Sequence, residues 1–320
     1  MSTKETAITT PTTAVVVTPV ISIPGLPPLK WLDTTSSTTR VRTPLIGNAT
    51  LDETNQSITM TTTKETDWFN PPPAPAPASI NTNTDTTTTT TESPAALCNA
   101  PALVFQRDNC DDGCDNTGDW QLSVKITMQH TNLFDAGTLF LHQGPNDWCK
   151  LCFEYSPECL PTIVSVVTQD ISDDANGPSI INSNSNSSSN SISSRTTTPT
   201  ATNSSSSSVY LRVSKYASVI AFHYSLDNDN GNNNNADEDT TKTNTNNSSN
   251  IQCSDEQKQQ QQQNQYWTLH RVFSMRNINK IPMSIGFLAQ APVGPDSCTA
   301  VFSEIQYYPQ KTLQNLRDGS

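Results

Sequence analysis

Residues 121–128 read QLSVKITM, a stretch in which every second residue is apolar. Leu122, Val124, Ile126 and Met128 alternate with polar or charged residues. Because successive side chains of a β-strand point to opposite faces, this period of two predicts a strand with one face in a core and one polar face.

The stretch WCKLCFEY at residues 148–155 shows the same period. Its two predicted faces carry Leu151, Phe153 and Tyr155 on one side, and Trp148, Lys150, Cys152 and Glu154 on the other. The second face mixes an aromatic ring, a cation and a carboxylate, so it is a candidate for ligand binding as well as for structure.

Shorter strand candidates surround these two stretches, and no amphipathic helix of convincing length accompanies them. These candidates are Ile163–Thr168, Tyr210–Ser214, Ser218–Ser225, Tyr266–Phe273, Pro282–Ala289 and Thr299–Tyr308. Many short strands without helical periodicity predict an all-β fold, an antiparallel β-sandwich or jelly roll.

Polar low-complexity tracts interrupt the chain. Hydrophobic residues make up only 33% of the sequence, so such tracts cannot bury enough apolar surface to offset the entropy of ordering. We predict a disordered N-terminal tail at 1–29 and one sandwich domain at 30–320, with low-complexity insertions at about 71–96, 178–208 and 228–265. The segments FHYSLDN and QYWTLHRVF flank the last insertion and are predicted to be two arms of one hairpin, because closure entropy grows slowly with loop length.

Composition also restricts partners and location. The formal net charge is −12 and the basic residues are scattered, a balance that repels phosphate backbones and anionic lipid. The apolar patch near Val20 is too short for a signal peptide or a membrane span. We therefore expect a cytoplasmic protein that contacts neither nucleic acid nor membrane.

Several longer stretches resemble a known family. They are FDAGTLFLHQGPNDWCKLCFEYSPECLPTIVSVVTQDISDDANG at 134–177, VYLRVSKYASVIAFHYS at 209–225, TDWFNPP at 66–72, NAP at 99–101, GFLAQAPVGPDSC at 286–298 and RDGS at 317–320. In this order the chain resembles a family of domains of unknown function that includes fungal proteins named for regulation of enolase. It departs at Ala291, where Ser is commoner, and in its insertions. The resemblance implies a concanavalin A-like sandwich, a fold shared with legume lectins and β-glucanases, and it makes enolase a candidate protein partner.

Catalysis is not expected. Glycosidases place two carboxylates about 5 to 10 Å apart, and glucanases of this fold commonly carry them on one strand in a Glu-x-Asp-x-Glu spacing. No strand candidate here has that spacing. An alternative is a glycan-active hydrolase with a non-standard carboxylate site drawn from Glu154, Asp173, Asp174 or Glu304.

The eight cysteines and four histidines do not predict a metal site or any other cofactor. Cys149 and Cys152 differ by an odd number along a strand, so their side chains should point to opposite faces. Cys110 and Cys114 lack a second ligand pair at zinc-finger spacing. Free thiols are the default in a reducing compartment.

The main functional hypothesis concerns the polar strand faces. If these strands share one sheet, their polar side chains form a groove that could hold a carbohydrate or a sugar phosphate. The candidate ligand-binding residues are Trp148, Lys150, Glu154, Asp173, Asp174, Arg212 and His223. The structural alternative is a cross-strand network of Lys150, Glu154 and Arg212. We therefore expect a non-enzymatic lectin-like binding protein, with a regulator of carbohydrate metabolism implied by the resemblance and a pure protein-interaction module as a further alternative.

Overall fold

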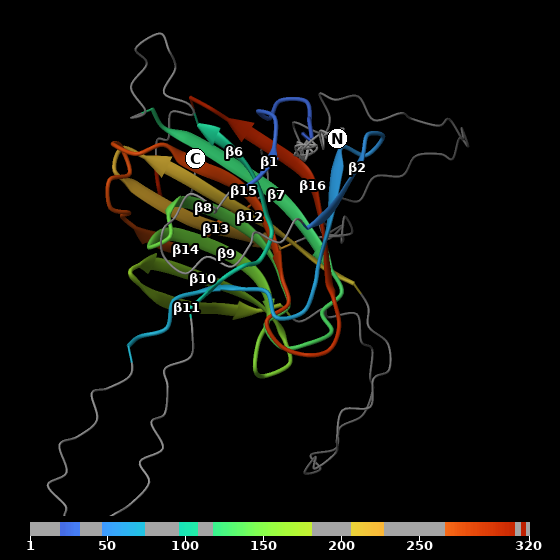
Figure 1. The fold of residues 1–320 in the computed structure, drawn as a ribbon. Helices are drawn as coiled ribbons and strands as arrows, with labels where there is room; N and C mark the ends of the chain where they lie inside the picture. The colour runs from blue at the N-terminus through green and yellow to red at the C-terminus, as the bar shows by residue number, and fades with distance from the viewer. Residues whose placement is uncertain are drawn as a thin grey trace, which may run out of the picture.

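The computed structural model describes residues 20–32, 47–73, 96–107, 118–180, 206–226, 266–310 and 315–317, and in this part of the chain every regular element is a β-strand. The strands form two seven-stranded sheets and a two-stranded ribbon (Figure 1). The first sheet has the order β1 (Lys30–Trp31), β6 (Ala102–Arg107), β15 (Met283–Gln290), β8 (Ala136–Gly144), β9 (Asp147–Tyr155), β10 (Pro161–Gln169) and β11 (Ile171–Ser179).

The second sheet has the order β14 (Thr268–Phe273), β13 (Val219–Leu226), β12 (Ser207–Tyr216), β7 (Trp120–Met128), β16 (Cys298–Tyr308), β3 (Ser57–Thr62) and β2 (Asn48–Asp52). The ribbon consists of β4 (Trp68–Phe69) and β5 (Leu97–Cys98). Neighbouring strands pair antiparallel in both sheets. The predicted antiparallel sandwich is therefore confirmed.

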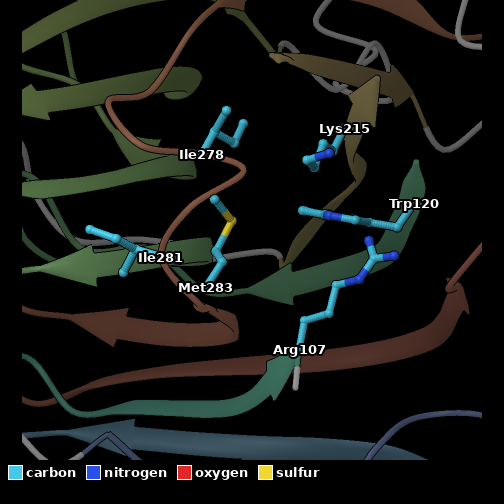
Figure 2. Close-up of a pocket in the computed structure, with 6 residues that line it drawn as sticks. All are labelled: Arg107, Trp120, Lys215, Ile278, Ile281 and Met283. Carbon is cyan, nitrogen blue, oxygen red and sulfur yellow. The ribbon is translucent and has the colours of Figure 1, made fainter. Parts of the chain in front are cut away.

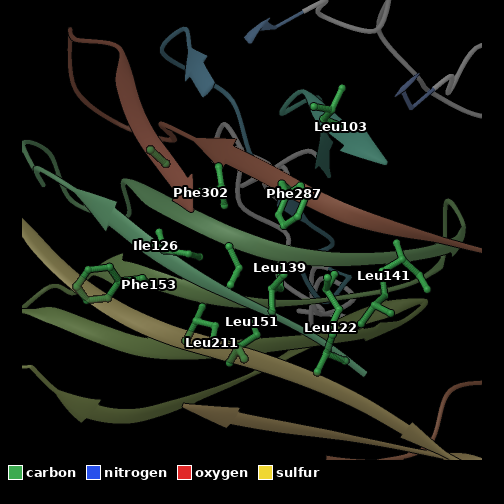
Figure 3. Close-up of a cluster of buried hydrophobic side chains, with 14 of the residues drawn as sticks. Leu103, Leu122, Ile126, Leu139, Leu141, Leu151, Phe153, Leu211, Phe287 and Phe302 are labelled. Atoms are coloured by element: carbon green, nitrogen blue, oxygen red, sulfur yellow. The ribbon is translucent and has the colours of Figure 1, made fainter. Parts of the chain in front are cut away.

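The core lies between the two sheets and follows the alternation of the sequence (Figure 3). Leu122 and Ile126 of β7 meet Leu151 and Phe153 of β9 in one buried cluster. The rings of Phe287 and Phe302, one from each sheet, lie 5.1 Å apart. Burial of these side chains supplies the main favourable term for folding, at about 25 cal/mol per Å² of apolar surface.

The strand predictions hold where alternation is clear. Residues 121–128 and 148–155 lie in β7 and β9, and the predicted hairpin arms pair as β13 and β14. Two long strands were not predicted. In β8, Ala136–Leu141 is buried on both faces, so the alternation disappears; β11 is an edge strand of polar residues and carries no apolar pattern.

The predicted domain boundary at residue 30 is too far along the chain. Ile21, Ile23, Leu26 and Leu29 are buried in the main core, and Ile21 and Leu29 form a β-bridge around the turn at Gly25. The apolar residues of this segment are few, which made it look like the polar tail before it. Residues 178–179 and 207–208, assigned to an insertion, lie in β11 and β12, whereas the predicted insertion at 228–265 lies outside the described residues.

The sandwich is closed along the edge where β14 meets β10 and β11. His270 Nε2 lies 2.9 Å from Ser165 Oγ of β10, and Arg271 Nη2 donates to Asp173 Oδ2 of β11 at 2.7 Å. These contacts join β14, an edge strand of the second sheet, to β10 and to the edge strand β11 of the first sheet, so side chains cover part of this edge. The described residues contain no helix long and apolar enough to cross a membrane.

Candidate functional site

Six of the seven candidate residues lie on two opposite outer faces of the sandwich. Trp148, Lys150 and Glu154 alternate on β9 with core residues and project from the first sheet, whereas Arg212 and His223 project from the second sheet. The condition for one common groove, that these strands share a sheet, is therefore not met. Alternation assigns a residue to a face of its own strand, but it does not tell which sheet that strand joins.

A strap covers part of the first sheet's outer face. We define the strap as residues 65–70 and 97–100, which include the β4–β5 ribbon. Trp68 packs against Phe140 at 4.8 Å and against Trp148 at 5.6 Å, and its Nε1 donates to the carbonyl of Ala100 at 2.9 Å. Trp148 is fully buried beneath it, so its ring presents no open surface to a sugar. This corrects the expected stacking role of Trp148.

Lys150 is held in place by the strap and by β15. Its Nζ donates to Asp67 Oδ1 at 2.8 Å and to Gln290 Oε1 at 2.7 Å, while only 3% of its side chain is exposed. Burial opposes the charged form, but Asp67 and neighbouring acidic groups outweigh it and raise the pKa of Lys150. Lys150 is therefore a charged, fixed hydrogen-bond donor at neutral pH.

Glu154 lies in the same part of this face. One row of paired residues crosses four strands of the first sheet. In it, Gln290 of β15 pairs with Ala136 of β8, Ala136 pairs with Glu154 of β9, and Glu154 pairs with Thr162 of β10. Since Lys150 Nζ reaches Gln290, the lysine side chain extends along its strand toward this row, where Ala136 offers only a methyl group.

Glu154 is 8% exposed and has no hydrogen bond or ion pair within the described part of the chain. Burial raises the pKa of its carboxyl to about 8, although Lys150 opposes the shift; Asp67 and Asp174 add to it. A buried carboxyl without a hydrogen-bond partner is costly, so its retention calls for an explanation.

The two aspartates of β11 separate. Asp174 lies opposite Val166 on the outer face near Glu154 and is exposed, so it belongs to the same group. Asp173 points to the other side and binds Arg271. Asp67 and Gln290 were missed as site residues; Asp67 stands in the quoted TDWFNPP motif, but nothing in the pattern places it over β9.

The second sheet's outer face is also covered. The guanidinium of Arg212 stacks on Trp267 at 3.8 Å and Nη1 donates to Gln121 Oε1 at 3.3 Å. The Nε2 of His223 lies 3.0 Å from the carbonyl oxygen of Leu316, so residues 315–317 lie against this face. Arg212 and His223 are buried as a result.

A small pocket lies elsewhere, at one end of the space between the sheets (Figure 2). It is lined by Arg107, Trp120, Lys215, Ile278, Ile281 and Met283. Its interior of about 10 Å³ is close to the volume that one water molecule needs, so a sugar does not fit. Arg107 and Lys215 both donate to the carbonyl of Gly118, at 2.8 and 3.5 Å. The two positive side chains at this end of the sandwich therefore have a hydrogen-bond acceptor within the protein.

No group of three His, Cys, Asp or Glu side chains in the described ranges could hold a metal ion. Cys149 lies in the core and Cys152 on the outer face, as their odd spacing predicted. The five cysteines that the structure describes are free thiols.

Comparisons with solved structures find similar chains at low sequence identity. A functionally unknown protein from Saccharomyces cerevisiae is similar at 14% identity and a TM-score of 0.47, with 88% of this chain and 95% of that one covered. The GH43 protein BlXynB from Bacillus licheniformis is similar at 10% identity and a TM-score of 0.37, with 65% of this chain and 33% of that one covered. A xylan β-1,4-xylosidase from Bacillus halodurans C-125 is similar at 9% identity and a TM-score of 0.39, with 65% and 29% covered. This chain therefore spans about a third of the length of the two Bacillus proteins.

No match was found among curated proteins. Residues 47–195 match the family model described as a protein of unknown function, DUF1349, which confirms that part of the resemblance to a family of unknown function.

Proposed function

We propose that this chain is a non-enzymatic binding protein that holds a carbohydrate ligand on the outer face of the first sheet, around Lys150 and Glu154. The observation that carries the proposal is the unpartnered carboxyl of Glu154 beside a fixed donor. Binding sites commonly place a few fixed polar groups in an apolar surrounding, and the buried side chains of Val164 and Val166 supply apolar neighbours here.

The available hydrogen-bonding groups suit sugar hydroxyls, which both donate and accept. Two of the three donors on Lys150 meet Asp67 and Gln290, which leaves one N–H for a ligand oxygen. A protonated Glu154 can donate one bond and accept others. A hydroxyl pair could therefore satisfy both groups.

Binding without turnover is favoured by the state of the other carboxylates. Asp67 accepts from Lys150 and from the backbone N–H of Trp68 at 2.7 Å, and Asp173 accepts from Arg271. On the second sheet, Glu304 Oε2 accepts a hydrogen bond from the hydroxyl of Tyr210 at 2.9 Å. Asp67, Asp173 and Glu304 are thus engaged with other groups; Asp174, exposed and near Glu154, is the remaining candidate for a glycosidase pair, and a glycan-turnover assay tests it. We include in the proposal a cytoplasmic location and a regulatory role in carbohydrate metabolism, as the resemblance to proteins named for regulation of enolase implies.

Calorimetric titration of the full chain with a panel of neutral mono- and oligosaccharides tests this proposal. We expect saturable binding that Glu154→Ala weakens by about tenfold, because this variant removes the side chain that both donates to and accepts from ligand hydroxyls. The matched variant Glu304→Ala, on the other sheet, should bind like the wild type.

Lack of binding across the panel would overturn the carbohydrate proposal and favour a protein-interaction module. Release of reducing ends from glycans, lost in Glu154→Gln, would overturn the non-enzymatic part. A ligand or protein partner that binds equally well to wild type and Glu154→Ala would place the function elsewhere on the molecule.

A further inference from the structure

The charges around Glu154 are unequal. Asp67 and Glu154 act electrostatically on the single ammonium group of Lys150, and Asp174 acts on Glu154. Asp67 forms an ion pair with Lys150, so within the described part of the chain Glu154 and Asp174 have no cation of their own on this face. Burial and this shortage of positive charge raise the pKa of Glu154, and a cation brought by a ligand would allow Glu154 to ionise.

Lys150 is a poor receptor for an anionic group. A phosphate approaching Nζ would compete with Asp67 Oδ1 at 2.8 Å and Gln290 Oε1 at 2.7 Å. It would also lie beside the charged carboxylate of Asp174, which repels it, and beside Glu154, which it would prevent from ionising. The arrangement therefore disfavours sugar phosphates, one of the two ligand classes expected from the sequence.

We propose that Glu154 binds an amine of the ligand, so that the preferred ligands of this site are amino sugars. The inference rests on the proposed carbohydrate function and deepens it. An ammonium group can donate to the unpartnered carboxylate of Glu154 and balance the excess negative charge, while neighbouring hydroxyls meet the free donor of Lys150.

The proton balance of this step is defined. In the free protein Glu154 is mostly protonated at pH 7, because burial raises its pKa to about 8. When a ligand ammonium binds, the carboxyl gives its proton to the buffer and its oxygen accepts the ammonium N–H. The other titratable groups facing Glu154 are Lys150 and Cys152 on β9, Asp67 and Cys98 on the strap, and Asp174 on β11; burial raises the pKa of both thiols, to about 12 and 11, so they stay neutral.

The test is calorimetry on the full chain at pH 7 with D-glucosamine, D-glucose and glucose 6-phosphate. We expect glucosamine to bind about tenfold more tightly than glucose. The buried ammonium–carboxylate pair contributes about a hundredfold over a neutral hydrogen bond, and release of the Glu154 proton at pH 7 offsets about tenfold of this, because the pKa of Glu154 is about 8. Glucose 6-phosphate should bind most weakly. The enthalpy of glucosamine binding should change with the ionisation enthalpy of the buffer, whereas that of glucose should not.

The Glu154→Gln variant keeps the shape of the side chain and removes its charge. In this variant we expect the ratio of glucosamine to glucose affinity to fall to about one and the buffer dependence to disappear. Glu304→Gln should keep both. The buffer dependence in the wild type tests the proposal even where the variant fails to fold.

Equal binding of glucose and glucosamine, or tightest binding of glucose 6-phosphate, would overturn the amine inference and leave the carbohydrate proposal standing. Absence of binding by all three sugars and by the wider panel would overturn both. Glucosamine binding without proton release would show that its amine meets a group other than Glu154, which also contradicts the inference.

Discussion

The two outer faces of this sandwich resemble each other in sequence and differ in structure. Each has a buried cation under a cover supplied by a distant segment: Lys150 under the strap, and Arg212 under Trp267 and the segment at Leu316. On the first face the cation is matched by Asp67 and a second carboxyl, Glu154, is left over; on the second face the cation lies on an aromatic ring. Polar residues at alternate positions therefore predict a face, but not its exposure, because the cover comes from elsewhere in the chain.

Removal of the cover should affect the first face most strongly. Trp68→Ala deletes a buried indole that packs on Phe140, His142 and Trp148, and we expect a loss of about 4 kcal/mol in the free energy of unfolding. The matched variant Trp267→Ala removes a half-buried ring stacked on Arg212 and should cost about 1 to 2 kcal/mol. Chemical denaturation measures both, and equal losses would show that the two covers are energetically alike.

The second comparison concerns the lysines. Lys150→Met leaves Asp67 without its cation on a mostly buried face, and we expect a destabilisation of about 3 kcal/mol. Lys125→Met, on the second sheet, loses a partly exposed pair with Glu304 at 3.9 Å and should cost less than about 1 kcal/mol. A double-mutant cycle of Lys150→Met with Asp67→Asn isolates the pair. Similar costs for the two lysines would contradict the difference between the faces.

The core of the fold follows from sequence because alternation is a local signal. Leu122, Ile126, Leu151 and Phe153 were assigned to the correct faces from their spacing alone. The site was only partly predictable. Lys150 and Glu154 could be placed on one face, but Asp67, which pairs with Lys150 across 83 positions in sequence, is brought there by tertiary packing that no periodicity encodes.

The pH dependence of stability gives a third test, centred on Glu154. Its pKa in the folded protein, about 8, exceeds the ordinary 4.5, so the folded state holds this proton more tightly. The stability that this proton contributes to the folded state is fully present below about pH 4.5, and it is lost as the pH rises to about 8. Burial lowers the pKa of His130 and His142 to about 4, but their protonation changes the free energy of unfolding only below about pH 6.5.

Between pH 6.5 and 8 the free energy of unfolding should therefore fall by about 2 kcal/mol, since each pH unit contributes about 1.4 kcal/mol. Denaturation series at several pH values measure the slope. Glu154→Gln should remove it, while Glu304→Gln on the other face should keep it. A slope that persists in Glu154→Gln would assign the titration to another group.

The smallest expected effect lies at the edge where the two faces meet. Asp173→Asn removes an ion pair with Arg271 in which the aspartate side chain is 73% exposed, so we expect a cost of about 0.5 kcal/mol that high salt abolishes. Arg271 Nη1 still donates to the carbonyl of residue 173 at 3.2 Å, which limits the loss.

The neighbouring variant Asp174→Asn should behave differently, because Asp174 raises the pKa of Glu154. The Asp174→Asn variant should therefore move the pH-dependent fall in stability to lower pH, whereas Asp173→Asn should not. If both variants move the slope equally, Asp173 and Asp174 do not lie on opposite sides of β11.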